Sequence, residues 1–290
     1  MILVTGATGT TGRHLVAQLI ERGAAFRTLV RDEARGRALG ADHVVGDFDD
    51  PASLAAAMDG IDRVFLASPG AQAVAGEQPM VRWERNVIDA ARDAGVRYVV
   101  KLSTLNAGVG RPMSEGGHGA IEEHLKSSGL EWTMLQAGPF MQNFLTPTAS
   151  LSDEHGNLVG PAGQAPAAFV DAHDIAASAA ALLTGEPHHG RSYVITGPEA
   201  IGYRQVAAKL SKGRGEPVGF VGESGETLVR RLRGYGLPDA AAEGLASLYD
   251  AMGAGAYGQV SDAVERLTGT APRDFDAFMA ANTKSFGALT

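Results

Sequence analysis

The chain opens with a short apolar run that leads directly into a glycine-rich turn, Met1-Ile2-Leu3-Val4-Thr5-Gly6-Ala7-Thr8-Gly9-Thr10-Thr11-Gly12. The apolar part predicts a buried β-strand, and the helical spacing of Leu15 and Leu19 before Gly23 predicts a helix behind the turn. Glycines at such a strand-to-helix switch allow a tight turn and close approach of the backbone to a ligand, while the helix N-terminus offers free N–H groups to an anion. The segment therefore predicts a dinucleotide site; the alternative is a turn that binds nothing.

The alternation of strands and helices continues through the first half of the chain. Apolar, β-branched runs predict further strands at 26–30, 43–45, 61–67, 96–103 and 131–136. Helical patterns lie at 83–94 and 119–128, and Asp50-Pro51 is typical of another helix start. This order predicts an α/β fold, a Rossmann-type doubly wound parallel sheet.

The second half has a different texture. Beyond Gly138 the strands become isolated, and helical patterns dominate at 175–183, 205–212, 228–235 and 240–252. We therefore expect an NAD(P)-binding Rossmann domain over residues 1–145 and a smaller, mostly helical substrate-binding lobe over 146–290. Segments near 168–197 are expected to return to the main sheet.

Composition excludes several classes of protein. Of 290 residues, 44% are hydrophobic and 20% charged, which suffices for a packed core. The net charge is −8 and there is no basic cluster, so a nucleic-acid partner is not expected. The chain has no cysteine, which removes disulfides, thiolate metal sites and thiol nucleophiles. With neither an export signal nor a long apolar run, we expect a cytoplasmic protein with no membrane partner.

The end of the second predicted strand bears on the choice of cofactor. Arg31 follows that strand and offers paired donors to a ribose 2′-phosphate, with Arg35 close behind, and this favours NADPH. Asp32 keeps NADH as the alternative, because a carboxylate there would accept from a free 2′-hydroxyl. A solvated charged turn is the third interpretation.

Several motifs occur together and in order. They are Gly6–Gly12, Val30-Arg31, Gly46-Asp47-Phe48-Asp49-Asp50, Leu102-Ser103-Thr104 and Ala137-Gly138-Pro139-Phe140-Met141-Gln142-Asn143-Phe144. With them the chain resembles the NmrA-like atypical short-chain dehydrogenases/reductases over nearly its full length. Within that family the likeness is greatest to NADPH-dependent quinone, azo-dye and triphenylmethane reductases.

The resemblance implies roles for matching residues. The pyrophosphate would lie against Gly6, Thr8, Gly9, Thr10, Thr11 and Gly12, and the 2′-phosphate against Arg31. Asp47 and Phe48 would flank the adenine, and Ala67, Ser68 and Pro69 would line the ribose and nicotinamide side. The nicotinamide and substrate entrance would involve Gly138, Pro139, Phe140 and Asn143. Each assignment has an alternative. Asp47 and Asp49 would be acids of an ordinary turn, Ser68-Pro69 would form a turn, and Phe140 and Phe144 would pack in the core.

The catalytic residues depart from the pattern of short-chain dehydrogenases. Those enzymes use a tyrosine followed four residues later by a lysine, and none of the six tyrosines here has such a lysine. The corresponding helix carries His118 and Glu122 instead. Histidine side chains in general titrate near neutral pH, so His118 is a candidate proton donor; the alternative is a structural histidine between loop and helix, with Glu122 solvated. Ser103 is a candidate hydrogen-bond donor or, alternatively, a helix or turn cap. His118 and Glu122 lack a third ligand nearby, so no metal is expected.

Two functions fit these features. One is an NAD(P)H-dependent oxidoreductase that transfers hydride to a quinone, azo dye or similar conjugated acceptor, for which water can supply the proton. The other is a non-catalytic NADP(H)-binding redox sensor that acts through a protein partner, which the missing Tyr-Lys pair favours. No flavin motif is visible, and a homo-oligomer is common in such folds although no pattern here names an interface.

Overall fold

The computed structural model describes residues 1–70, 72, 74, 76–145 and 152–283. The chain forms two compact units. The first consists of Met1–Gln72, Gly76–Ala137 and Ala172–Val194, and the second consists mainly of Gly138–Asp171 and Ile195–Thr290. The first unit thus ends at Ala137 and resumes at Ala172, whereas the sequence prediction put a boundary near residue 145.

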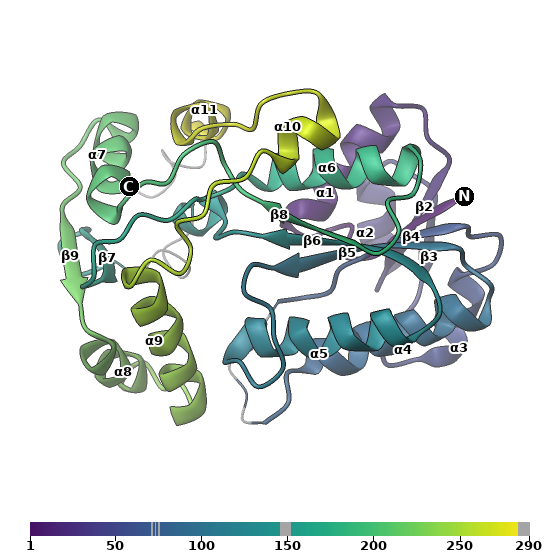
Figure 1. Ribbon diagram of the computed structural model, residues 1–290, viewed down its shortest axis with the longest axis horizontal. Coiled ribbons are helices and arrows are strands. Elements are labelled where there is room, and N and C mark those ends of the chain that lie inside the picture. Colours follow the sequence, from purple (N-terminus) through teal and green to yellow (C-terminus); the bar gives the residue numbers. More distant parts are fainter. Residues whose placement is uncertain (71, 73, 75, 146–151, 284–290) are drawn as a thin grey trace. The chain divides into compact units, whose positions relative to one another are not determined.

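A seven-stranded sheet forms the centre of the first unit (Figure 1), in the order β3-β2-β1-β4-β5-β6-β8. In this order, each pair of neighbouring strands from β3 through to β6 is parallel. The strands are β1 (Ile2–Val4), β2 (Phe26–Val30), β3 (His43–Val45), β4 (Arg63–Leu66), β5 (Tyr98–Thr104), β6 (Glu131–Ala137) and β8 (Arg191–Ile195). The predicted Rossmann-type α/β fold is confirmed.

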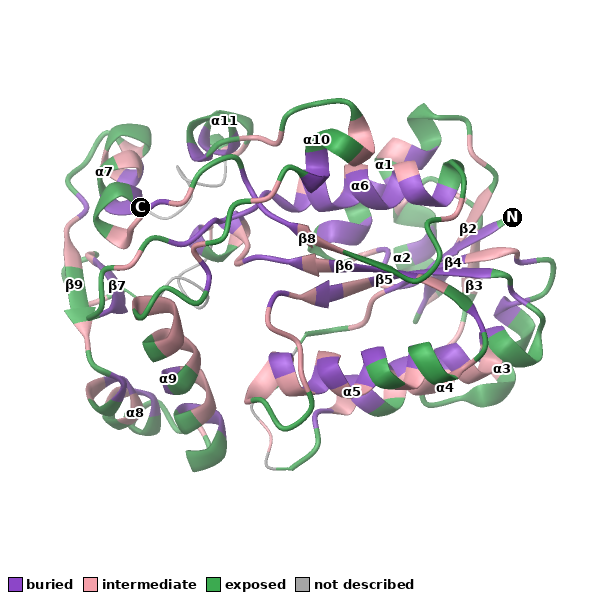
Figure 2. Ribbon diagram, in the orientation of Figure 1, coloured by how far each residue is buried: buried purple, intermediate pink, exposed green. Residues whose placement is uncertain are grey.

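Helices cover both faces of this sheet. Helices α1 and α6 lie on one face, and α3, α4 and α5 lie on the other (Figure 1). Figure 2 shows the buried residues concentrated on the strands and on the inward helix faces. The helices of this unit are α1 (Thr10–Glu21), α2 (Glu33–Ala38), α3 (Pro51–Ala57), α4 (Pro79–Asp93), α5 (Met113–Ser127) and α6 (Ala172–Thr184).

The strand order reverses between β1 and β4. Val4 pairs with Thr28 of β2 on one side and with Phe65 of β4 on the other, and the chain winds outward in both directions from there. Parallel sheets bind ligands at this kind of reversal, outside the carboxyl ends of the strands. The glycine loop after β1 and the segment after β4 both lie at that edge.

Helix α5 begins earlier than the predicted start at Gly119. Its first turns carry Gly116, Gly117 and Gly119, which weaken a helical pattern in the sequence. Packing requires at least two of them: a Cβ on Gly116 would lie 2.1 Å from the carbonyl oxygen of Arg111, and one on Gly119 would lie 2.3 Å from the carbonyl carbon of Gly108. The loop before α5 therefore packs directly on the helix backbone, and His118 lies inside the helix.

The second unit contains a two-stranded sheet. Strands β7 (Leu158–Pro161) and β9 (Phe220–Glu223) pair in parallel. Phe144, Phe169, Tyr203 and Phe275 form an aromatic cluster with edge-to-face contacts. Its helices are η1 (Met141–Phe144), α7 (Tyr203–Arg214), α8 (Gly225–Gly234), α9 (Asp239–Gly253), α10 (Ala263–Thr268) and α11 (Phe275–Ala281).

The segment around Phe169 and Val170 belongs to the second unit, where Val170 forms an isolated bridge with Phe140, whereas β8 joins the main sheet. Within the described residues, no helix has both the length and the apolar character needed to cross a membrane.

Candidate functional site

The glycine loop is shaped by close backbone contacts. Gly6 has a φ of 62°, a left-handed value that favours glycine, and a Cβ there would lie 3.0 Å from the carbonyl oxygen of Ala67 after β4. A Cβ on Gly12 would lie 2.1 Å from the carbonyl oxygen of Gly6. The loop therefore folds back on the start of α1 with no room for side chains at these two positions.

The N-terminus of α1 has the features of an anion site. Gly9 is its N-cap residue, no side chain caps it, and its first turn contains no acidic residue. The Thr11 Oγ1 atom is buried and has no hydrogen-bond partner among the described residues. Free amides, a positive helix end and an unused buried hydroxyl fit a pyrophosphate.

The end of β4 is held against the end of β1. The Thr5 hydroxyl donates to the carbonyl oxygen of Ala67 at 2.8 Å, and the Ala67 amide donates back to the same hydroxyl at 2.9 Å. The next residue, Ser68, donates to Glu84 Oε1 of α4 at 2.8 Å. The predicted ribose and nicotinamide segment, Ala67 to Pro69, is therefore joined to the glycine loop on one side and to a buried carboxylate on the other.

The residues after β2 separate into two roles. Asp32 is the N-cap of α2: its Oδ1 accepts from the Arg35 amide at 2.8 Å, and its Oδ2 forms an ion pair with the Arg35 guanidinium at 2.9 Å. Both carboxylate oxygens are thus engaged within the chain. Arg31 is exposed and makes no hydrogen bond or ion pair within the described part of the chain, so its guanidinium is available to a ligand.

A groove of about 740 Å³ lies between α1 and α2. Two arginines line it, Arg13 from α1 and Arg35 from α2, together with Thr8 of the glycine loop. The Arg13 Nε donates to the Thr8 carbonyl oxygen at 2.9 Å, which directs this side chain along the loop. Sequence reasoning did not select Arg13, although its position immediately after the last glycine of the motif was a usable signal.

Asp49, the second acidic residue of the loop after β3, holds that loop in place. Asp49 accepts from Arg82 at 2.7 and 3.0 Å and from the Trp83 indole at 2.8 Å, and the Arg82 guanidinium holds the pKa of Asp49 below its usual value. Asp47 is exposed, and its Oδ1 accepts from the Asp49 amide at 2.8 Å. The ring of Phe48 packs against the core of the first unit. The predicted adenine residues thus lie in one ordered turn.

A buried charged network lies beside this edge of the sheet. Lys101 of β5 is fully buried, and its ammonium forms an ion pair with Glu84 Oε2 at 2.8 Å. The same ammonium donates to the carbonyl oxygen of Leu102 and contacts His118 Nδ1 at 3.0 Å. Together with the bond from Ser68 to Glu84, these contacts form one connected path from the β4 end to α5.

The environment of this network changes its titration. Burial raises the pKa of Glu84, against the opposing effects of the Lys101 ammonium and the Ser68 hydroxyl. For His118, burial and then the nearby Lys101 charge lower the pKa well below the ordinary value near 6.5. His118 is therefore neutral at neutral pH. This differs from the sequence expectation of a histidine that titrates near pH 7 and donates a proton as the imidazolium.

The other two catalytic candidates contact each other. Ser103 of β5 donates to Glu122 Oε1 at 2.6 Å, and Gln136 of β6 donates to the same oxygen at 3.0 Å. Lys126 lies 3.6 Å from the other oxygen of Glu122. The single hydroxyl proton of Ser103 is thus used inside the first unit, and Ser103 is neither a helix cap nor a turn cap here.

Residues predicted for the nicotinamide and substrate entrance lie in the second unit. Gly138 donates to the Ile195 carbonyl oxygen at 2.9 Å, and the Pro139 carbonyl oxygen accepts from Val170 at 2.9 Å. The Asn143 amide donates to the Phe140 carbonyl oxygen at 3.2 Å, within the turn that forms η1.

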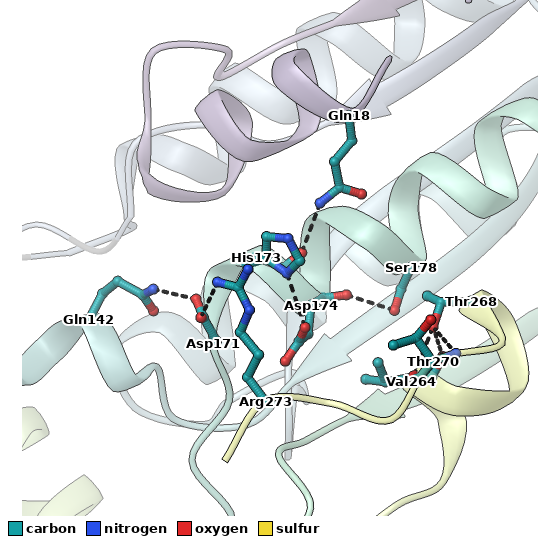
Figure 3. A network of polar contacts seen from close by, with 10 residues as sticks. All are labelled: Gln18, Gln142, Asp171, His173, Asp174, Ser178, Val264, Thr268, Thr270 and Arg273. Atoms are coloured by element: carbon teal, nitrogen blue, oxygen red, sulfur yellow. Dashed lines mark hydrogen bonds and ion pairs between the residues drawn. The ribbon is translucent and has the colours of Figure 1, made fainter. Parts of the chain in front are cut away.

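A buried carboxylate holds this turn in place. Asp171 accepts from the Gln142 side chain at 2.6 Å and from Arg273 at 3.2 Å (Figure 3). In the first unit, the start of α6 has its own contacts: Gln18 of α1 donates to the His173 carbonyl oxygen at 3.2 Å, and Ser178 donates to that of Asp174 at 2.9 Å. The Asp171 contacts order the segment of the second unit that carries the predicted entrance residues.

Within the described ranges, no group of three or more histidine, aspartate or glutamate side chains is arranged to hold a metal ion.

Comparison with known proteins identifies the family of this chain. The sequence profile of the NmrA-like family matches residues 1–279. The chain belongs to the NmrA-like family. The family resemblance seen in the sequence is thereby confirmed.

Relatives within the family include several reductases. An NAD(P)H azoreductase of Xenophilus azovorans is 36% identical over 292 residues, which cover 99% of this chain and 100% of the relative. The structure of an NADPH-dependent quinone oxidoreductase from Escherichia coli in complex with NADPH has 30% identity and a TM-score of 0.83, covering 97% of this chain and 99% of that one. The triphenylmethane reductase of Citrobacter sp. with NADP(H) has 26% identity, a TM-score of 0.82 and coverages of 97% and 100%.

Sequence reasoning about this NmrA-like chain missed Lys101 and Glu84. The signal for Lys101 was a lysine inside an otherwise apolar, central strand pattern, where a charged side chain needs a buried partner. Glu84 lies on the inward face of α4, between Met80 and Ile88, and is 1% exposed. Each position alone indicated burial, but only the fold brings the two side chains together.

The lowered pKa of His118 predicts a pH dependence of stability. As the pH falls through about 6.5, the unfolded chain takes up a proton at this histidine and the folded protein does not. The free energy of unfolding therefore decreases below about pH 6.5, by at most about 1.4 kcal/mol per pH unit for this one group. Urea unfolding at a series of pH values measures it.

His118→Gln is the variant that isolates this contribution. Its unfolding free energy should fall less steeply below about pH 6.5 than that of the unmodified protein. His155→Gln, at a histidine with 74% of its side chain exposed, is the matched control and should keep the original slope. Equal slopes for all three proteins would contradict the assignment.

Proposed function

We propose that this protein is an NADPH-dependent reductase that transfers hydride to a quinone, an azo dye or a similar flat conjugated acceptor. The observation that carries the proposal is the uncapped N-terminus of α1 behind a loop in which Gly6 and Gly12 leave no room for side chains. The names of the family relatives, which include azo, quinone and triphenylmethane reductases, support the acceptor class.

The residues of the first unit fit a phosphorylated dinucleotide. Asp32 caps α2 and pairs with Arg35, so part of its capacity to accept hydrogen bonds is already used within the chain. Arg31 is exposed and unpaired in the described chain, and Arg13 lines the groove beside the loop. Guanidinium groups bind phosphate through paired donors, so these positions favour NADPH over NADH.

When bound, NADPH supplies the hydride. The chain's own residues would bind and orient the cofactor: the α1 amides would hold the pyrophosphate, the turn with Asp47 and Phe48 would flank the adenine, and Ala67 to Pro69 would line the ribose and nicotinamide. As part of the same proposal, Gly138, Pro139, Phe140 and Asn143 contact the acceptor. A conjugated acceptor takes up hydride and one proton, which water supplies, so no Tyr-Lys pair is required.

The competing function is a redox sensor that binds NADP(H) without turnover and acts through a protein partner. One experiment separates the two. NADPH is titrated into the purified protein, and a quinone and then an azo dye are added while the absorbance of the reduced cofactor is recorded. We expect saturable binding followed by cofactor oxidation. Tight binding with no oxidation by any acceptor in a broad panel would reject the reductase and support the sensor.

Arg31→Ala should weaken NADPH binding more than NADH binding. A charge-assisted hydrogen bond contributes about 1.5–3 kcal/mol, so we expect the Kd for NADPH to rise about 10-fold to 100-fold with little change for NADH. Calorimetric titration with both cofactors measures this.

Arg37→Ala removes the same charge from α2, where Arg37 is exposed and 4.0 Å from Glu33, and serves as the control. It should leave both affinities nearly unchanged. An equal loss of NADPH and NADH affinity in Arg31→Ala would refute contact with the 2′-phosphate.

A further inference from the structure

In the first unit the fully buried Lys101 contacts the partly exposed His118, and the proposed function uses neither side chain. Lys101 Nζ forms an ion pair with Glu84 Oε2, donates to the Leu102 carbonyl oxygen and contacts His118 Nδ1. An ammonium has no lone pair and can only donate. His118 Nδ1 must therefore accept, and the ring proton of neutral His118 must be on Nε2.

We propose that Lys101 is a positioning residue that holds the His118 ring with Nδ1 as acceptor and its proton on Nε2, and that this N–H donates to the acceptor during its reduction. The inference rests on the proposed function and goes beyond it by giving His118 a chemical role. Hydride addition leaves negative charge on a quinone oxygen or an azo nitrogen. A fixed donor stabilises that charge, and water then supplies the proton.

The surroundings of His118 leave Nε2 for this task. Among the described residues Nε2 makes no hydrogen bond, and the residue as a whole keeps some exposure while Nδ1 contacts the buried ammonium. His118 lies early in α5, which follows the carboxyl end of β5, the edge of the sheet that carries the glycine loop and Ser68.

The charged groups on the strand and helices near His118 have partners of their own. Lys101 lies on β5, and its partner Glu84 lies on α4. On α5 itself, Glu115 is 3.8 Å from Arg111, and Glu122 accepts from Ser103 and Gln136. Burial and the Lys101 charge both disfavour the imidazolium, so the neutral ring persists through the neutral range.

The test of positioning is a ¹H–¹⁵N spectrum of the histidine rings as a function of pH, with His118 assigned from the His118→Gln variant. In the unmodified protein we expect a protonated Nε2 and an unprotonated Nδ1 from about pH 8 down to about pH 6. Lys101→Met combined with Glu84→Gln removes both buried charges together, which avoids leaving one of them unpaired. In this double variant the titration midpoint of His118 should move up toward 6.5.

Lys126→Met is the matched control, because it removes a positive charge from α5 that contacts Glu122 and Glu123 rather than His118. The midpoint there should stay where it is in the unmodified protein. A proton on Nδ1, titration near 6.5 in the unmodified protein, or equal midpoints in the double variant and the unmodified protein would overturn the positioning role. These spectra need neither cofactor nor acceptor, so they stand even if the proposed reductase function fails.

The donor role is tested by quinone reduction in two variants. His118→Phe should lower kcat about 100-fold or more with an unchanged Kd for NADPH, and His118→Gln, which keeps an N–H donor, should recover part of that loss. The unmodified protein should show no fall in kcat as the pH rises from about 6 to about 8, since the imidazolium is not the acid. Equal activity of both variants and the unmodified protein, or a fall in kcat across that range that His118→Gln abolishes, would overturn the donor role.

Discussion

The fold and the candidate site both depend on the close packing of the glycine loop against itself and against β4. Gly12 lies against the Gly6 carbonyl, and Gly6 lies against that of Ala67, at distances that admit no Cβ without displacement. This packing fixes where α1 begins and leaves its first amides without side-chain partners. A helix start that is bare of caps costs stability unless water or a ligand satisfies its amides, and at the strand reversal the ligand that fits is an anion.

A second constraint at the same edge is the buried pair of Lys101 and Glu84. Removing two charges from water costs several kcal/mol per ion, and the attraction between them offsets this only when the remaining donors and acceptors are also satisfied. Here Ser68 donates to Glu84, and the Lys101 ammonium contacts a carbonyl oxygen and His118. The pair thus connects the segment after β4 to a ring on α5.

The sequence was informative where a signal is local. The glycine loop, the alternating strands and the Asp50-Pro51 helix start each depend on a few consecutive residues, and the structure confirms them. Asp32 was interpreted from the sequence as a candidate ribose ligand or as part of a solvated charged turn; its contacts with Arg35 show that it is the N-cap of α2.

Tertiary packing explains what the sequence could not show. The glycines in α5 obscured its start, because their reason is the loop carrying Gly108 that packs on the helix. The shifted pKa of His118 arises from burial and from a lysine on another element, and neither is visible in the spacing of His118 and Glu122. The residues proposed to contact the acceptor were predicted from the family resemblance alone. Their contacts within the chain, such as the backbone hydrogen bonds of Gly138 and Asn143, do not indicate what substrate they would bind.

The central claim is that this chain holds a reduced nicotinamide for direct hydride transfer to a conjugated acceptor. The most direct measurement is a single-turnover reaction of the protein with a quinone and NADPH carrying deuterium at the transferred position of C4, followed by stopped-flow absorbance. The account predicts that cofactor oxidation is slower with deuterium than with hydrogen and that deuterium leaves the cofactor. Cofactor that binds and keeps both its absorbance and its deuterium in the presence of acceptor would contradict it.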